Sequence, residues 1–376
     1  MIGPDNCDQL ADTDSNRKLV VVLGMHRSGT SLITRGLESI GLITGDNLIQ
    51  AIPGVNEKGF FEDVDFVELN EELLAECGKD WHSLEPIEES DVDDLLEKGY
   101  LKRAADLLQV KRSLYPRFVF KDPRTTRLLA FWSKVFESEG LDVHYIMAIR
   151  NPLSVAKSLL ARDGFSPLFS YYLWIGYILS GLEYAQKRPA FIVDYDRVIE
   201  DPFTEFKAIA GWLRMPFDSN AVNDYAHNFI CSSLRHSIAS LAELLSDEVA
   251  PQLCKDIYSH LTKSLGGHDA QSPATDSSCY KDWTEQQHLI APLLRLVDQQ
   301  YNTIQESKAA NKEAQVKAEH AMAHAMAEAE HARAETEHAR AETEHANMMR
   351  IQIENSHLWK ALLPARRLLD AIKSLS

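Results

Sequence analysis

Continuous apolar runs recur along the first half of the chain. The stretches 19–23, 117–120, 143–149 and 191–193 are almost wholly apolar and rich in β-branched or aromatic side chains. They lack the alternation of polar and apolar residues that marks a half-exposed strand, and such runs are typical of strands buried on both faces of a parallel sheet. We therefore predict an α/β fold in which a parallel sheet is flanked by helices.

Segments with helical periodicity separate these runs. After the first run, apolar residues recur at helical spacing until Gly41 ends the segment; they are Leu32, Ile33, Leu37 and Ile40. Pro152 suits the first turn of a second helix. Residues 168–186 are apolar on nearly all sides, which predicts a helix buried against the sheet, and they are too interrupted for a membrane span. Residues 42–115 have a mainly helical and acidic pattern.

The pattern changes after about residue 265. A polar linker, residues 266–280, leads to a predicted helix over 281–350. HARAETE occurs twice in tandem there, at 331–337 and 338–344, which gives a seven-residue period. Small residues alternate at spacings of four and three, as in a coiled-coil seam: Ala325, Ala329, Ala332, Thr336, Ala339, Thr343 and Ala346. Because such a seam is weak, self-association through a coiled coil and a solvated single helix both remain open.

The two ends of the chain differ in character. Residues 351–376 combine large apolar side chains with four cations, Lys360, Arg366, Arg367 and Lys373. They predict an amphipathic C-terminal helix that can contact a membrane surface or a partner, with Pro364 interrupting or kinking it. Residues 1–17 are polar, lack the pattern of a signal peptide and are expected to be disordered. The main globular domain is thus predicted over residues 18–265.

Composition narrows the possible functions. The 376 residues carry a formal net charge of −17, which argues against nucleic-acid binding and means that an anionic ligand needs a local basic pocket. The chain has no apolar run of the roughly 18–20 residues that span a membrane and no metal-ligand spacing, so no metal is expected. Five scattered cysteines fit reduced thiols and a cytoplasmic protein better than a disulfide framework: Cys7, Cys77, Cys231, Cys254 and Cys279.

The segment that follows the first run has the composition of an anion-binding loop. Its residues are Gly24, Arg27, Ser28, Gly29, Thr30 and Ser31. Backbone N–H groups and the positive end of the next helix converge at such a loop. A nucleoside-triphosphate loop requires Lys and then Ser or Thr after its second glycine, whereas this chain has Thr30 and Ser31. The cation is Arg27, which suits a smaller anion held bidentately without metal. A glycine turn that only packs the helix on the sheet, with Arg27 exposed, is the alternative.

A second basic position follows the run 143–149. Arg150 comes directly after it, and Ser158 lies about two turns into the helix that begins near Pro152. Ligands of open α/β sheets bind at the carboxyl ends of the strands, so these two side chains could converge on one phosphate. The alternative is that Arg150 caps a strand and Ser158 is solvated.

The two segments together resemble the sulfotransferase family, whose members use 3′-phosphoadenosine 5′-phosphosulfate (PAPS). The family's 5′-phosphosulfate loop has a basic residue followed by Ser-Gly-Thr-Thr/Ser, which residues 27–31 match. Its 3′-phosphate motif is a strand-terminal Arg with a Ser eight positions later, as in Arg150 and Ser158. A Tyr that ends a later strand seven residues before a Pro matches Tyr195 and Pro202. The resemblance covers about residues 18–240 and implies the sulfotransferase fold and PAPS binding at these positions.

Further segments look like the bacterial carbohydrate-type sulfotransferases: GMHRSGTS at 24–31, NEKGFFED at 56–63 and FKDPR at 120–124. The animal cytosolic type has Lys at the position of Arg27 and a catalytic His where this chain has Pro123, so a histidine base by that route is excluded. That type's glycine-rich motif ending in Trp-Lys-Asn is also not found in this sequence. Arg235 is the best remaining basic candidate for the donor site.

The resemblance also implies catalytic roles. Arg27 is expected to stabilise the charge that grows on the oxygen between phosphorus and sulfur. Lys121, at the end of the run 117–120, is placed near the sulfuryl group, unless it is a surface charge beside Asp122.

The base for the acceptor hydroxyl has two candidates. Glu62 is the first choice, because an aromatic stretch precedes it and related carbohydrate-type enzymes often use a glutamate. Asp122 is the second, since it lies closest to the missing histidine. Either carboxylate has a structural alternative: Glu62 could cap a helix near Val64, and Asp122 could pair with Arg124 or Arg127.

Histidines and aromatic residues offer weaker signals. His26 lies in the loop without an evident orienting partner, and His144 is expected to be packed within a strand. Phe60, Phe61 and Trp81 could form a platform for a sugar or belong to the core.

These patterns together predict a PAPS-dependent sulfotransferase. The expected acceptor is a hydroxyl of a carbohydrate, such as a polysaccharide or glycolipid. A phosphoryl-transfer enzyme with a degenerate loop is one alternative. A non-catalytic scaffold that uses the C-terminal tail is the other.

Overall fold

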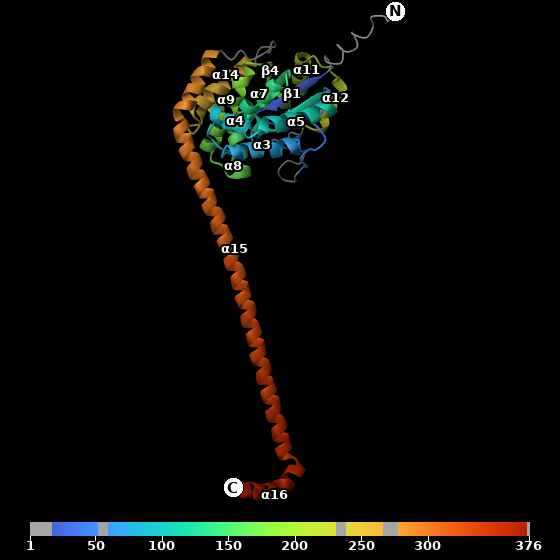
Figure 1. Cartoon of the computed structure of the whole chain (residues 1–376), viewed down its shortest axis with the longest axis vertical. Helices are drawn as coiled ribbons and strands as arrows, with labels where there is room; N and C mark the ends of the chain where they lie inside the picture. Colours follow the sequence, from blue (N-terminus) through green and yellow to red (C-terminus); the bar gives the residue numbers. More distant parts are fainter. Residues whose placement is uncertain (1–16, 52–58, 231–237, 266–276, 374–376) are drawn as a thin grey trace, which may run out of the picture. The chain divides into compact units, whose positions relative to one another are not determined.

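The computed structural model describes residues 17–51, 59–230, 238–265 and 277–373 (Figure 1). The chain divides into two compact units, of which the first ends at Gln299 and the second begins at Gln300. Arg235 falls outside the described residues, so its predicted role has no structural counterpart here.

A parallel sheet forms the centre of the first unit. Its strands are β1 (Lys18–Leu23), β2 (Arg117–Lys121), β3 (Val143–Ile149) and β4 (Ala190–Asp194), in the order β2-β1-β3-β4. Each neighbouring pair is parallel, with Val20 opposite Val119 in β2 and His144 in β3. The predicted α/β class is confirmed, and all four apolar runs are strands. Their carboxyl ends lie at one edge of the sheet, where the motif residues begin.

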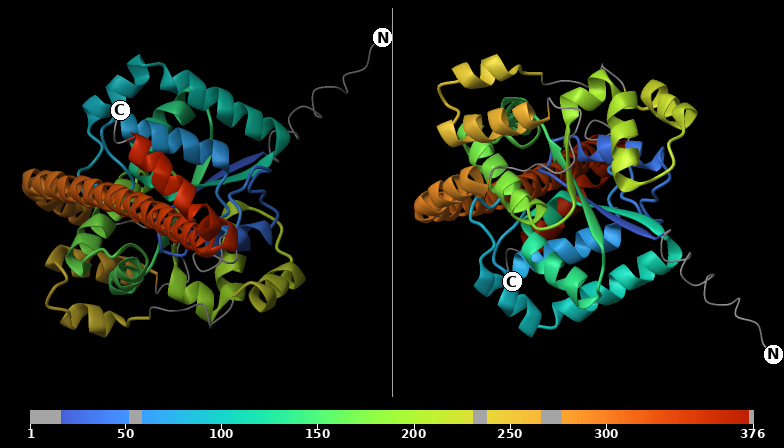
Figure 2. Two further views of the ribbon diagram at one scale, coloured as in Figure 1. Left: turned by 90° about the horizontal axis from the view of Figure 1, so that it is seen from below. Right: turned by 90° about the horizontal axis from the view of Figure 1, so that it is seen from above.

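Helices cover both faces of the sheet, which explains why its strands show no polar alternation (Figure 2). One face packs against α2 (Thr30–Glu38), α10 (Tyr195–Glu200), α11 (Pro202–Leu213) and α12 (Ser219–Asn228). On the other face, Phe66 of α3 (Val64–Glu76) stacks on Phe120 with ring centroids 4.0 Å apart. Trp132 of α7 (Leu129–Ser138) contacts the same two rings.

The remaining helices of the first unit complete these layers. They are α4 (Glu89–Glu97), α5 (Tyr100–Leu114), α6 (Pro123–Arg127), α8 (Pro152–Asp163), α9 (Pro167–Ala185), α13 (Leu241–Ser246) and α14 (Gln252–Ser264). Helix α8 begins at Pro152 as predicted, and Asn151 caps it by accepting a hydrogen bond from the Leu153 N–H. Helix α9 is buried on most of its surface, which confirms the prediction for 168–186. Among the described helices, none combines the length and apolarity that crossing a membrane requires.

Helix α15 (Ser277–Asn355) belongs partly to each unit. Its first part carries the buried side chains Trp283 and Leu294, so the compact unit extends past the expected domain end at residue 265. Apart from half-buried Tyr301, the described residues of its second part are exposed. The hydroxyls of Thr336 and Thr343 each donate to the carbonyl four residues earlier.

The helical tail is interrupted at a different position from the one predicted. Helix α16 (His357–Lys373) continues through Pro364, where an interruption or kink was expected. The interruption lies at Ser356, whose hydroxyl accepts a hydrogen bond from the Trp359 N–H and so caps the new helix. Of the two expected effects of Pro364, an interruption or a kink, the interruption was therefore wrong. Strong helix formers on both sides of Pro364 offset the one backbone hydrogen bond that the proline removes.

Candidate active site

The loop after β1 is held in a conformation that glycine permits. Gly24 has φ +137°, its N–H donates to the Thr126 hydroxyl at 2.9 Å, and a Cβ there would lie 2.7 Å from the carbonyl oxygen of Ala148. Gly29 has φ +84°, and its Cβ would lie 2.1 Å from the Tyr195 ring. Both positions therefore require glycine, and they bring the loop close to β3 and to Tyr195.

The same loop presents hydrogen-bond donors at the start of α2. Gly29 precedes Thr30 as the N-cap and supplies no side-chain cap, so within the described part of the chain no capping side chain accepts from the first amides of α2. The Ser28 hydroxyl is fully buried and has no hydrogen-bond partner among the described residues. Free amides and an unpaired buried hydroxyl fit a bound phosphate or sulfate group.

The two motif segments meet at Arg27. The Arg27 Nε donates to the Ser158 hydroxyl at 2.8 Å, and Nη1 of Arg150 donates to the Arg27 carbonyl at 3.0 Å. The Arg150 guanidinium also lies 4.3 Å from the centroid of the Tyr195 ring. Ser158 is buried, so the interpretation of it as a solvated residue was wrong.

Positive charge is concentrated at this meeting point. The pKa of Arg27 is lowered, first because burial disfavours its charge and second because Arg162 and Arg150 repel it. Cations brought together in this way favour binding of an anion, which would relieve the repulsion.

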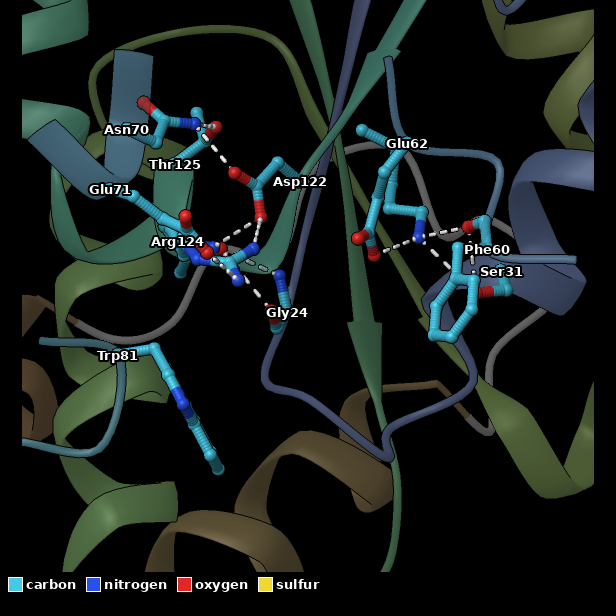
Figure 3. A network of polar contacts seen from close by, with 12 residues as sticks. Gly24, Ser31, Phe60, Glu62, Asn70, Glu71, Trp81, Asp122, Arg124 and Thr125 are labelled. Atoms are coloured by element: carbon cyan, nitrogen blue, oxygen red, sulfur yellow. Dashed lines mark hydrogen bonds and ion pairs between the residues drawn. The ribbon is translucent and has the colours of Figure 1, made fainter. Parts of the chain in front are cut away.

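Lys121 and Glu62 form a buried ion pair across the loop (Figure 3). The Lys121 Nζ lies 2.6 Å from a Glu62 carboxylate oxygen and 3.2 Å from the Ser31 hydroxyl, and it also donates to the Phe60 carbonyl. Burial raises the pKa of Glu62, while Lys121 acts in the opposite direction. Lys121 is only 2% exposed, so the alternative of a surface charge was wrong.

Asp122 belongs to a separate network (Figure 3). One of its oxygens accepts from the Asn70 amide at 2.8 Å, and the other accepts from the N–H and Nη1 of Arg124. It thereby caps α6. The expected pairing with Arg124 is present, whereas Arg127 donates to the Glu85 carbonyl. These contacts give Asp122 a structural role.

The structural alternative for Glu62 is not found. Asp63, and not Glu62, caps α3, because its side chain accepts from the Asp65 N–H. The Asp63 carboxylate also pairs with Lys111 at 2.6 Å. Glu62 therefore has no capping role; it pairs with Lys121 and lines the adjoining cleft.

A cleft of about 510 Å³ opens beside the loop and contains the candidate chemistry. The lining residues include His26, Arg27, Ser31, Glu62, Trp81 and Arg162. Asp122 is absent from the described lining residues. Glu62 thus faces the same space as the loop cation.

His26 and Trp81 form one wall of this cleft. Their ring centroids are 4.6 Å apart, and Arg162 lies 5.2 Å from the Trp81 centroid on its side of the cleft. The pKa of His26 is well below its usual value because the ring is buried and cations surround it, so the imidazole is neutral. Its Nε2 has no hydrogen-bond partner among the described residues.

The structure also places the remaining aromatic and basic residues, some of which the sequence motifs indicated and some of which they did not. Phe61 packs against Phe229, and His144 contacts Trp212 near the start of β3. No motif singled out Arg162, because it lies at the end of α8 without a distinctive neighbour. Arg124, by contrast, is the last residue of the FKDPR segment, so the motif could have indicated it as a site residue.

The fold is thus a parallel α/β sheet with a basic loop and a cleft at the carboxyl ends of its strands. The chain belongs to the sulfotransferase family, whose model matches residues 20–219. A comparison with curated proteins finds no match.

Three solved structures are similar to this chain at low identity. A sulfotransferase domain from the olefin synthase of Synechococcus PCC 7002 has 15% identity and a TM-score of 0.38, covering 72% of this chain and 94% of that one. A sulfotransferase domain from the curacin biosynthetic pathway has 14% identity and a TM-score of 0.36, with coverages of 72% and 97%. A sulfotransferase from Mycobacterium tuberculosis H37Rv has 14% identity and a TM-score of 0.34, with coverages of 66% and 79%.

Proposed function

We propose that this sulfotransferase transfers the sulfuryl group of PAPS to a carbohydrate hydroxyl. Family membership supports sulfuryl transfer in general. The observation that carries the finer proposal is the junction of Arg27, Ser158 and Arg150, which joins a 5′-type loop to a 3′-type motif.

Donor binding is assigned to two groups of residues. Ser28, Gly29, Thr30 and Ser31, with the free amides of α2, would hold the 5′-phosphosulfate, and Gly24 provides the turn that brings the loop to β3. Arg150 and Ser158 would hold the 3′-phosphate, with Tyr195 packed against the Arg150 guanidinium. Arg235 remains a candidate for the same phosphate.

The reaction needs charge stabilisation and a base. PAPS would supply the sulfuryl group and the phosphate oxygen that leaves. Arg27 and Lys121 would stabilise the negative charge on that oxygen. Glu62 would accept the proton of the acceptor hydroxyl as the oxygen–sulfur bond forms, because its pKa is raised and it lines the cleft. Asp122 is the weaker candidate, since its oxygens already accept hydrogen bonds.

The acceptor would enter the cleft that Trp81 and Phe60 help to line. An aromatic ring beside polar side chains is a common surface for a sugar. Incubation of the protein with PAPS and a panel of glycans tests the proposal. We expect release of adenosine 3′,5′-bisphosphate with at least one glycan, and its absence with every acceptor contradicts the proposal.

Two further measurements, of ATP turnover and of PAPS binding, separate the alternatives. Mg²⁺-dependent turnover of ATP that is lost in Thr30→Ala would favour phosphoryl transfer. PAPS binding without turnover would favour a scaffold.

The tail and the cellular location are also proposals. We propose that the protein acts in the cytoplasm and that α15 self-associates through the small-residue seam, with α16 contacting anionic lipid through its cations. Light scattering of the full chain and of a chain ending at Gln299 tests self-association. Flotation with phosphatidylserine vesicles tests the lipid contact.

A further inference from the structure

The segment that carries Trp81 has no regular secondary structure. It runs from the end of α3 to the start of α4, and its residues 77–88 form turns and coil. Trp81 nevertheless forms a wall of the cleft. Some other part of the molecule must therefore hold this segment in place.

The first part of α15 supplies that support. Both carboxylate oxygens of Asp298 accept backbone hydrogen bonds from the segment, one from the Leu84 N–H at 2.9 Å and the other from the Glu85 N–H at 2.8 Å. One turn earlier, Arg295 pairs with the Glu85 carboxylate at 2.6 Å. Four residues from two distant parts of the chain are thus joined at one point.

A second set of contacts links this point to Trp81. Buried Arg127 donates to the Glu85 carbonyl, and its guanidinium lies 5.5 Å from the Tyr177 ring. The Tyr177 hydroxyl donates to the Trp81 carbonyl at 2.8 Å. The backbone of the segment is therefore held at Trp81 and at Glu85.

The junction between α15 and the Trp81 segment contains two charged groups that are largely shielded from solvent. Arg127 is 3% exposed, and two of its guanidinium nitrogens have no hydrogen-bond partner among the described residues. The Asp298 carboxylate is one of the negative charges that attract this cation. Burial raises the pKa of Asp298, while its backbone hydrogen bonds and Arg127 lower it. Taking a cation and a carboxylate out of water costs free energy, which their contacts at this junction must offset.

We propose that Asp298 is a positioning residue, through which the first part of α15 holds Trp81 in place to form the acceptor wall. This inference rests on the proposed function, because it takes the Trp81 side of the cleft as the acceptor side. Asp298 touches neither the loop residues nor Glu62. The donor site should thus be independent of it.

The test compares Asp298→Asn with Asp282→Asn, an exposed carboxylate on the same helix, in the full-length chain. The asparagine keeps one acceptor but loses the second and the charge. We expect the acceptor KM to rise about tenfold, as loss of charge-assisted hydrogen bonds permits, with kcat and the affinity for adenosine 3′,5′-bisphosphate unchanged. In Asp298→Glu, which keeps the charge, the acceptor KM should lie between that of the unaltered protein and that of Asp298→Asn.

A direct readout of Trp81 does not depend on turnover. In protein labelled with 5-fluorotryptophan, the ¹⁹F resonance of Trp81, assigned with Trp81→Phe, should shift or broaden in Asp298→Asn and stay unchanged in Asp282→Asn. An unchanged resonance, or an unchanged acceptor KM with a lower melting temperature alone, overturns the inference. If no acceptor is turned over by the unaltered protein, the proposed function fails, and the resonance alone decides whether Asp298 positions Trp81. Arg295→Ala, which removes only the exposed pair with Glu85, serves as a second variant should Asp298→Asn not fold.

Discussion

The guanidinium of Arg27 donates to the Ser158 hydroxyl at 2.8 Å and so joins two segments that lie 131 positions apart in the chain. Arg27 belongs to the loop after β1, and Ser158 belongs to α8 after β3. Because β1 and β3 are neighbouring parallel strands, their carboxyl ends bring both segments to one edge of the sheet. The pair marks the point where one doubly phosphorylated nucleotide could contact both segments.

Replacing Arg27 or Arg150 with alanine should weaken binding of adenosine 3′,5′-bisphosphate. Each arginine would make charge-assisted hydrogen bonds worth about 1.5–3 kcal/mol, which corresponds to a loss of roughly 10- to 150-fold in affinity. Titration calorimetry measures it. Arg35→Ala removes an exposed arginine on α2 and serves as the control. Unchanged affinity in both site variants would rule out the assigned donor site.

Glu62→Gln should remove the acidic limb of the pH profile. Burial raises the pKa of Glu62, so kcat/KM should rise with pH through a range above that of an ordinary glutamate. We expect kcat to fall by about 10²- to 10⁴-fold in the variant. Glu71→Gln, which removes the exposed partner of Arg124, should leave the profile unchanged. Retention of the acidic limb in Glu62→Gln would assign the base elsewhere.

Gly29→Ala should disrupt the loop far more than a comparable change elsewhere. Its new Cβ would lie 2.1 Å from the Tyr195 ring, in a backbone conformation that alanine disfavours. Gly140 has a similar φ of +60° but open space around it, so Gly140→Ala should cost only about 1–2 kcal/mol. Thermal unfolding and nucleotide binding measure the difference. Equal effects of the two substitutions would mean that the contact with Tyr195 is unimportant.

A chain that ends at Gln299 should fold like the full chain, whereas one that ends at residue 265 should be destabilised. The shorter chain loses the buried side chains Trp283 and Leu294, each worth about 1.5–3 kcal/mol when buried. Urea unfolding followed by near-ultraviolet circular dichroism compares the two. Equal unfolding midpoints would show that α15 contributes nothing to the first unit.

Asp194 should make the protein less stable as pH rises from 4 to 6. Burial raises the pKa of this carboxyl to about 6, so the folded state binds more protons than the unfolded state across that range. The free energy of unfolding should therefore fall with pH, by about 3 kcal/mol at about 1.4 kcal/mol per pKa unit. Asp194→Asn keeps the cap of α10 and should remove this decline.

Asp201→Asn is the matched control for that experiment. Asp201 also caps a helix, α11, but hydrogen bonds with Thr204 lower the pKa of its exposed carboxyl. The decline between pH 4 and 6 should persist in this variant. A flattened profile in Asp201→Asn, or an unchanged one in Asp194→Asn, would assign the decline to other groups.

Local patterns predicted the scaffold well because the physics behind them is local. The apolar runs indicated buried parallel strands, and the glycines and Arg27 indicated an anion-binding loop before any contact was known. The expected interruption at Pro364 was wrong, because the cost of a proline depends on the rest of its helix. The helix is interrupted at Ser356 instead, where a new one begins. The roles assigned to the loop residues stay predictions.

The sequence alone determined the order of the strands along the chain, the burial of both sheet faces and the position of the loop cation, since hydrophobic period and turn chemistry are properties of short segments. Only the tertiary structure decided that Lys121 pairs with Glu62, that Asp122 joins Asn70 and Arg124, and that Asp298 holds the backbone of Leu84 and Glu85. The pairing of a buried charge depends on which distant segment the fold brings within about 3 Å, and most of these partners lie more than 50 positions apart in the chain.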